Sequence, residues 1–218
     1  MLSKVTLDFL VKLKKNNNRE WFEKNKPTFL LMKSEVESLM EEVLKACSKT
    51  DASLKDIDSK KTVFRIYRDV RFSKDKSPYK SHMGAIISKG GKENKTTGFY
   101  IHIEPGGSFM AAGAWQPDAP LLKKIRQEID YNTTDFKKII ANKKFQNYWG
   151  ELENHRLSNP PKGYDKSHPD IELLKLTSYI FSHKINDAQL TGKTLVKEIA
   201  DGYKIITPFL QFINTALE

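Results

Sequence analysis

The residues of this sequence with the clearest capacity for chemistry lie between Lys60 and Lys92, where positive charge is concentrated. This basic segment holds ten of the chain's 37 Lys and Arg residues but only two of its 27 acidic residues. The whole chain has a formal net charge of +10 at pH 7, so the other residues are almost neutral together. Arg offers a planar bidentate donor and Lys a compact charge, and both bind phosphate and carboxylate groups. We therefore predict a binding site for a small anionic ligand in this segment.

The candidate ligand-binding residues are the cationic, phenolic and imidazole side chains of the basic segment: Arg65, Tyr67, Arg68, Arg71, Lys74, Lys76, Tyr79, Lys80 and His82. Four of these are expected to clamp the anion, namely Arg65, Arg71, Lys76 and Lys80. Because side chains alternate along a strand, a strand over residues 63–69 would direct Arg65 and Arg68 to opposite faces. Arg68 would then lie on the apolar face and need an acidic partner, because an unpaired buried charge costs several kcal/mol.

Two other interpretations of the basic segment stay open. In the first, it is a solvated edge whose cations form salt bridges with Glu20, Asp69 and Asp75. In the second, its aromatic residues stack on bases while its cations contact a nucleic-acid backbone. Nucleic-acid binders more often spread their charge over a whole face, so nucleic acid is the less favoured partner.

A second group of chemically capable residues follows in residues 97–104, which alternate like a strand. His102 and Glu104 share one face of this predicted strand, and His82 on a neighbouring predicted strand can approach them. An imidazole beside a carboxylate can transfer protons, and two imidazoles with a carboxylate can also bind a metal. His102 and Glu104 are the candidate acid/base catalysts, although a structural, hydrogen-bonded histidine is the more favoured interpretation. No metal site is predicted, and the cofactor is left unknown.

Hydrophobic periodicity indicates the elements that position these groups. Apolar residues at spacings of three and four predict helices, and alternating residues predict strands. The predicted helices cover residues 3–13, 27–47, 118–129, 135–141 and 195–217, and the predicted strands cover residues 63–69, 81–88, 97–104, 108–115 and 176–182. This order predicts an α+β fold. It would be a single domain over residues 1–218, with a mostly antiparallel sheet of about four or five strands packed by N- and C-terminal helices.

Composition excludes some classes of protein and restricts others. The single cysteine, Cys47, excludes an internal disulfide and a cysteine zinc cluster, and its apolar surroundings predict a buried thiol. Charged residues interrupt the apolar start of the chain, so we expect neither a signal peptide nor a membrane span and predict a cytoplasmic protein.

Trp21 and Trp115 are expected to pack in the core, and the Glu residues of the helix over 27–47 are expected to face solvent.

Several of these segments resemble the large, mainly bacterial family known as domain of unknown function 2461. The segments that carry the resemblance are residues 17–22, 64–80, 100–107, 113–117 and 160–165, followed by His168-Pro169. The resemblance covers nearly the whole chain and implies a single soluble domain of about this length with no established activity. One departure is Thr177, which stands before Ser178 where the family often carries a Lys.

Two functional hypotheses follow. The chain is either an enzyme or binding domain for a small phosphorylated or carboxylated compound, or a non-catalytic module whose basic loop docks nucleic acid or an acidic protein. The compactness of the basic segment, next to a His-x-Glu strand, favours the first. Neither the reaction, if there is one, nor the oligomeric state follows from the sequence.

Overall fold

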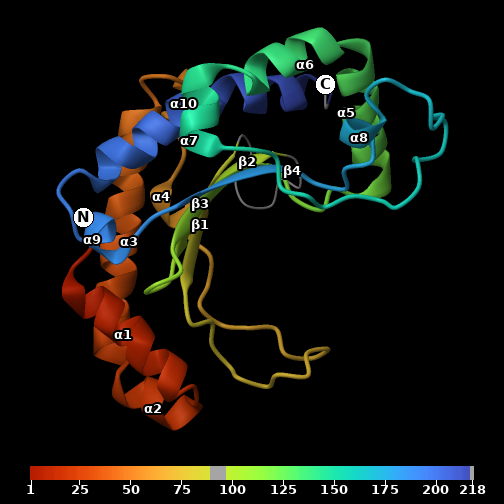
Figure 1. Ribbon diagram of the computed structural model, residues 1–218. Helices are drawn as coiled ribbons and strands as arrows, with labels where there is room; N and C mark the ends of the chain where they lie inside the picture. Colours follow the sequence, from red (N-terminus) through yellow and green to blue (C-terminus); the bar gives the residue numbers. More distant parts are fainter. Residues whose placement is uncertain (89–96, 217–218) are drawn as a thin grey trace. The chain divides into compact units, whose positions relative to one another are not determined.

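The computed structural model describes residues 1–88 and 97–216 (Figure 1), so residues 89–92 of the basic segment lie outside the described part. The helices are α1 (Lys4–Lys15), α2 (Arg19–Lys24), α3 (Lys26–Cys47), α4 (Ser59–Thr62), α5 (Ala119–Tyr131), α6 (Thr133–Ile140), α7 (Lys143–Trp149), α8 (Ile171–Leu174), α9 (Asp187–Leu190) and α10 (Leu195–Thr215), with a short 3-10 turn at Ala52–Leu54. The strands are β1 (Met83–Ile87), β2 (Gly98–Ile103), β3 (Phe109–Ala114) and β4 (Tyr179–Lys184). The five longer predicted helices and four of the five predicted strands are therefore present.

The four strands form one open antiparallel sheet in the order β1-β2-β3-β4. Helices and sheet together confirm the predicted α+β class. By its internal contacts the described chain divides into two compact units. The first contains residues 1–88, 100–110 and 184–201, and the second contains residues 97–99, 111–183 and 202–216. The single-domain assignment remains a prediction.

Helix α3 is the central helix of the first unit, and α1, α2, α4 and β1 all contact it (Figure 1). Its apolar residues recur every three or four positions and form one buried stripe, which includes Phe29, Met32, Val36, Leu39 and Val43. Side-chain caps are present at the two preceding helices, α1 and α2. The Ser3 hydroxyl accepts a hydrogen bond from the Thr6 amide, and the Asn18 side chain accepts one from the Trp21 amide.

Glu35 corrects the expectation that the acidic face of α3 is wholly solvated. One of its carboxylate oxygens accepts hydrogen bonds from the Ser3 amide at 3.1 Å, the Ser3 hydroxyl at 2.9 Å and the Thr6 hydroxyl at 2.6 Å. These bonds tie the start of α1 to the middle of α3. Periodicity identified the polar face correctly, but it carries no information about which helix start lies against that face.

The predicted strand over residues 63–69 is wrong as a continuous strand. Only isolated antiparallel bridges occur there, between Val63 and Ala85 and between Tyr67 and Tyr79. Residues 63–82 instead form a loose hairpin that connects α4 to β1 (Figure 1), held by hydrogen bonds from the Arg68 amide to the Pro78 carbonyl and from the Lys80 amide to the Ile66 carbonyl. Towards the tip of the hairpin, Pro78 has no amide hydrogen with which to extend the pairing beyond Tyr67 and Tyr79.

In the second unit, β3 and β4 approach each other so closely that glycine is required. Gly113 has φ +130°, and a Cβ atom there would lie 1.9 Å from the Tyr179 carbonyl oxygen. Trp115, just beyond β3, was expected in the core but is 53% exposed. The chain turns at Gln116, which has φ +44° and donates its amide hydrogen to the Ser178 hydroxyl at 3.0 Å. This turn leaves the indole outside the core, against His155.

Candidate functional site

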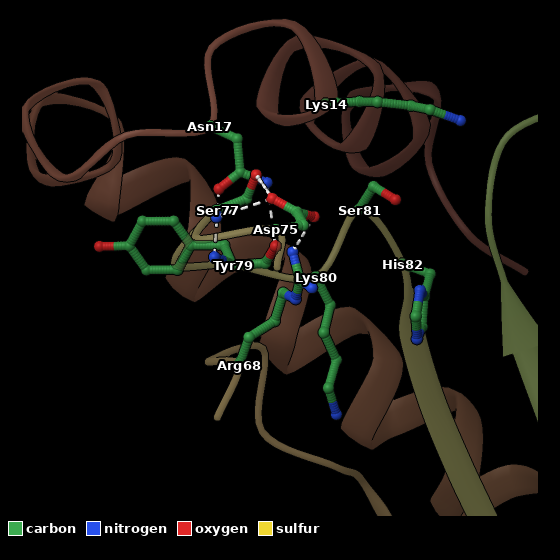
Figure 2. A pocket seen from close by; sticks show the side chains of 9 residues that line it. All are labelled: Lys14, Asn17, Arg68, Asp75, Ser77, Tyr79, Lys80, Ser81 and His82. Carbon is green, nitrogen blue, oxygen red and sulfur yellow. Dashed lines mark hydrogen bonds and ion pairs between the residues drawn. The ribbon is translucent and has the colours of Figure 1, made fainter. Parts of the chain in front are cut away.

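A polar cavity of about 470 Å³ lies in the first unit, between the α1–α2 region and the hairpin over residues 63–82 (Figure 2). Its lining residues are Lys14, Asn17, Arg68, Asp75, Ser77, Tyr79, Lys80, Ser81 and His82. Three of these are cations and one is a carboxylate, so the lining carries an excess of positive charge. Lys14 comes from the last turn of α1, and the other charged groups come from the hairpin.

The predicted ligand-binding residues divide into two groups. Arg68, Tyr79, Lys80 and His82 line the cavity. The others do not line it, namely Arg65, Tyr67, Arg71, Lys74 and Lys76. Of the four residues expected to clamp an anion, only Lys80 is therefore at the cavity. Side chains in a short irregular hairpin point in several directions, so charges that are close in sequence do not converge.

Asp75 is the acidic group that organises the hairpin. Its carboxylate accepts hydrogen bonds from the Ser77 hydroxyl at 2.6 Å and the Ser77 amide at 2.9 Å, and it forms an ion pair with Arg68 (Figure 2). These bonds, those from Ser77 first, hold the pKa of Asp75 well below its usual range. The pairing expected for Arg68 is present, although its partner lies within the same loop.

The side chain of Asn17 pairs with the second arm of the hairpin, at Tyr79, as a neighbouring strand would. Its side-chain amide donates to the Tyr79 carbonyl at 2.9 Å, and its side-chain oxygen accepts from the Tyr79 amide at 3.1 Å. The Tyr79 ring is buried and stacks on Phe22, with centroids 3.9 Å apart and an interplanar angle of 12°. In Figure 2 this ring points away from Asp75 and Lys80. Tyr79 therefore anchors the hairpin.

Lys80 differs from the other two cations of the cavity. Lys14 pairs with Glu104 and Arg68 pairs with Asp75, whereas within the described residues Lys80 has no carboxylate within ion-pair distance. Its ammonium lies 5.6 Å from the centre of the Phe64 ring. Burial, followed by the nearby Arg65 charge, lowers the pKa of Lys80. This cation is thus partly desolvated and still has hydrogen-bonding capacity for an anion.

Glu104 connects the cavity to the predicted acid/base pair. One carboxylate oxygen, Oε1, accepts from Lys14 Nζ at 3.1 Å and from the Ser81 hydroxyl at 3.3 Å. The other, Oε2, lies 3.2 Å from His102 Nε2. His102 Nδ1 is in turn 3.1 Å from the Tyr100 hydroxyl. Residues 100, 102 and 104 thus form one hydrogen-bonded row on a single face of β2, because side chains alternate along a strand.

His82 completes this group from the start of β1. Its ring lies 4.2 Å from the His102 ring, centre to centre, and His102 is also stacked on Phe109 at 4.6 Å. Burial lowers the pKa of His82 to about 4, with smaller contributions from His102 and Lys80. The His82 imidazole is therefore neutral at pH 7. The predicted approach of His82 to His102 and Glu104 is present in the structure.

The protonation of the neighbouring groups follows from their surroundings. Burial raises the pKa of Glu104, but hydrogen bonds from His102 and Lys14 outweigh it and leave this pKa below its ordinary value. Burial raises the pKa of Tyr100 to about 12. At neutral pH Tyr100 is therefore a protonated phenol and Glu104 a carboxylate, one on each side of His102. Such a row can accept or deliver a proton at His102.

Sequence reasoning did not select Lys14, Asn17, Ser81 or Tyr100 as site residues. Lys14 and Asn17 carry no local signal, because they come from another part of the chain. Tyr100 could have been found, because strand alternation places it on the same face as His102 and Glu104. Ser81 could not be selected from the sequence, because its role depends on the hydrogen bond from its hydroxyl to Glu104.

Fold and site together define an α+β protein with a cation-lined cavity next to a Tyr-His-Glu strand. The chain belongs to the family described as "Conserved hypothetical protein (DUF2461)", which it matches over residues 5–212. This confirms the resemblance recognised in the sequence. No curated protein and no solved structure matches the chain. Among the described residues, no helix is both long enough and apolar enough to cross a membrane.

Proposed function

We propose that the protein binds a small anionic ligand, bearing a phosphate or carboxylate group, in the cavity lined by Lys14, Arg68 and Lys80. The observation that carries this proposal is Lys80, a partly buried cation at the cavity without a carboxylate partner among the described residues. A desolvated ammonium gains more from an anion than an exposed one, because water screens it less. The other two cations reinforce the field while holding Glu104 and Asp75 in place.

The hydroxyl groups of the cavity support the same ligand class. Ser77 and Ser81 line it beside the cations, and hydroxyls donate readily to phosphate and carboxylate oxygens. In a catalytic form of the proposal, the anion binds next to the Glu104 carboxylate. His102 then exchanges a proton with the bound anion. The row from Tyr100 to Glu104 then keeps the His102 imidazole oriented, as an acid/base group requires.

Calorimetric titration with inorganic phosphate and with succinate tests the proposal. We expect at least one of these anions to bind, and Lys80→Met to weaken that binding about 10- to 100-fold, because a charge-assisted hydrogen bond contributes about 1.5–3 kcal/mol. Lys74→Met is the matched control, since Lys74 is exposed and does not line the cavity. If neither anion binds, or if both variants lose affinity equally, the proposal is wrong.

One observation favours a second candidate function, in which the tip of the hairpin docks a nucleic-acid backbone. Phe72 is 96% exposed, and the Arg71 guanidinium lies 5.8 Å from the centre of its ring. Lys74 and Lys76 are exposed nearby. An exposed aromatic ring among cations is suited to base stacking, which contributes about 1–3 kcal/mol per base.

Binding of single-stranded DNA at low and at physiological salt separates the two functions. Docking predicts that Phe72→Ala weakens binding about 5- to 100-fold, and that affinity falls steeply with salt. Lys80→Met, inside the cavity, should leave DNA binding nearly unchanged. Absence of DNA binding at low salt would remove the second candidate.

A further inference from the structure

The two histidines and the glutamate beside the cavity are close enough to share one ion. One ring nitrogen from each of His82 and His102 and one carboxylate oxygen of Glu104 all lie within 4.8 Å of one another. We propose that these three side chains bind a single divalent metal ion of the Zn²⁺ class. This inference does not depend on anion binding, because it concerns only the chain's own donor atoms. It goes beyond the sequence, which predicted no metal site.

The donor set suits such an ion. Zn²⁺ binds imidazole nitrogen and carboxylate oxygen at about 2.0–2.2 Å, so tetrahedral ligand atoms lie about 3.4 Å from each other. His102 Nε2 and Glu104 Oε2 are 3.2 Å apart, which is already close to that spacing. The donor nitrogen of His82 lies within 4.8 Å of both atoms, so the His82 side chain, which is partly exposed, must move closer to them to share the ion. Two nitrogens and one oxygen without sulfur also favour Zn²⁺ or a similar first-row ion over Cu(I).

Two of the three ligands, His102 and Glu104, have one side-chain atom held by a neighbour outside the cluster. The Tyr100 hydroxyl lies 3.1 Å from His102 Nδ1, and Lys14 and Ser81 bond to Oε1 of Glu104. The remaining atoms, His102 Nε2 and Glu104 Oε2, face each other at 3.2 Å, so an ion bound between them would replace their hydrogen bond. Outer partners of this kind orient metal ligands and are part of most protein metal sites.

The position of the cluster also leaves a coordination position accessible. His82 lines the cavity, so an ion bound to the three side chains would lie at its wall. Three protein ligands with a fourth position for water or substrate are typical of catalytic zinc sites, whereas structural sites use four protein ligands. The cations that we propose to bind an anion lie in the same cavity. A metal there would complete the recognition of a phosphate or carboxylate oxygen.

Metal binding to chelator-treated protein tests the proposal directly. Titration with Zn²⁺ should give one ion per chain, and Co²⁺ should produce visible absorption of a four- or five-coordinate site. His82→Ala and Glu104→Gln should each weaken Zn²⁺ binding at least 100-fold, because each removes a ligand. Tyr100→Phe should weaken it about 10- to 100-fold through the loss of an outer partner.

His155→Ala is the matched control, since His155 belongs to the second unit and forms a His–Glu pair with Glu153, with 3.0 Å between His155 Nε2 and Glu153 Oε2. It should bind Zn²⁺ as the wild type does. His82 is only partly buried, so His82→Ala should stay folded, and circular dichroism checks this. Wild-type protein that binds no Zn²⁺ or Co²⁺, or a folded His82→Ala variant with unchanged affinity, would overturn the proposal. Phosphate titration of His82→Ala and Zn²⁺ titration of Lys80→Met distinguish failure of this site from failure of the anion site.

Discussion

Arg68 and Lys80 are cations of the same cavity, yet their surroundings give them different roles. Arg68 pairs with Asp75, so much of its charge is already balanced inside the hairpin. Lys80 is partly buried, lies near the Phe64 ring and the Arg65 charge, and has no carboxylate partner among the described residues. Under the proposed function, Arg68 mainly stabilises the loop and Lys80 mainly binds the anion. The identity of a residue alone did not separate these roles.

At the same scale, Gly84 leaves the space that Tyr100 needs in the row formed by residues 100, 102 and 104. A Cβ atom at this position would lie 2.6 Å from the Tyr100 hydroxyl oxygen, which is the group next to His102. Tyr100 is constrained by its burial and by that contact, so it cannot move freely. Glycine is therefore needed here for space and not for an unusual backbone angle.

We predict that Gly84→Ala lowers the free energy of unfolding by about 1–3 kcal/mol, because overpacking forces Tyr100 away from His102. Adding Tyr100→Phe removes the closest clashing atom, so the double variant should be less destabilised than the sum of the single variants. Urea unfolding of the four proteins measures this coupling. Gly107→Ala is the control, because its nearest neighbour would lie at an ordinary 3.7 Å. Simple additivity of the two changes would contradict the steric argument.

At the scale of elements, the hairpin over residues 63–82 is held from outside as much as by its own pairing. The Asn17 side chain satisfies both backbone groups of Tyr79, and the Tyr79 ring stacks on Phe22 in α2. Helix α3 is similarly tied to α1 through Glu35 and the residues at the start of α1. Loops and helix starts in the first unit are thus fixed by a few polar side chains at defined positions.

The pH dependence of the α1–α3 contact follows from the pKa of Glu35. Burial raises this pKa, but hydrogen bonds from Thr6 and Ser3 outweigh it and leave the folded-state pKa below the ordinary 4.5. A group with a depressed folded pKa stabilises the fold above its unfolded pKa and loses that contribution as pH falls through the folded pKa. The stabilising effect of Glu35 should therefore be complete at neutral pH and fade below about pH 4.5.

We predict that Glu35→Gln costs about 1–2 kcal/mol of unfolding free energy at pH 7, because bonds to a charged acceptor are replaced by bonds to a neutral one. The difference from the wild type should shrink as pH is lowered through the acidic range. Chemical denaturation at several pH values measures it. Glu41→Gln, an exposed change on the same helix, should have little effect at any pH. A difference that grows towards low pH would contradict the assigned hydrogen bonds.

At the scale of the whole molecule, the division into two compact units raises the question of whether the two units unfold together. Cys47 is the only cysteine and lies buried at the end of α3 in the first unit. Burial, with a smaller contribution from Asp51, raises the pKa of its thiol to about 12. The thiolate is the reactive form, so the native thiol should be inert at pH 8 and become reactive only when the first unit opens.

We predict that Cys47 reacts with a thiol reagent at pH 8 only in the denaturant range where far-UV circular dichroism is lost. Small single domains usually unfold in one cooperative transition, so coincident midpoints are expected for the single domain predicted from the sequence. Labelling in fully unfolded protein sets the maximal rate. Thiol exposure well before the loss of circular dichroism would show that the two units unfold separately, and rapid labelling of native protein would contradict the assigned burial.

The sequence by itself determined the features that depend on near neighbours along the chain. Helix periodicity, the caps at Ser3 and Asn18, the four paired strands and the concentration of charge in residues 60–92 were all predictable, because each reflects interactions over a few residues. Alternation along β2 also placed His102 and Glu104 on one face. The α+β class followed from the order of these elements.

Only the tertiary structure decided which of these residues meet. It brings Lys14 to Glu104, Asn17 to Tyr79 and His82 to His102, and it leaves Arg71 and Lys76 outside the cavity. It also replaced the strand predicted over residues 63–69 with a hairpin. The physical reason is that these contacts depend on backbone pairing and burial between distant segments, for which local spacing contains no signal. Charge in a sequence shows where an anion site can form, but the fold decides which cation remains free to bind.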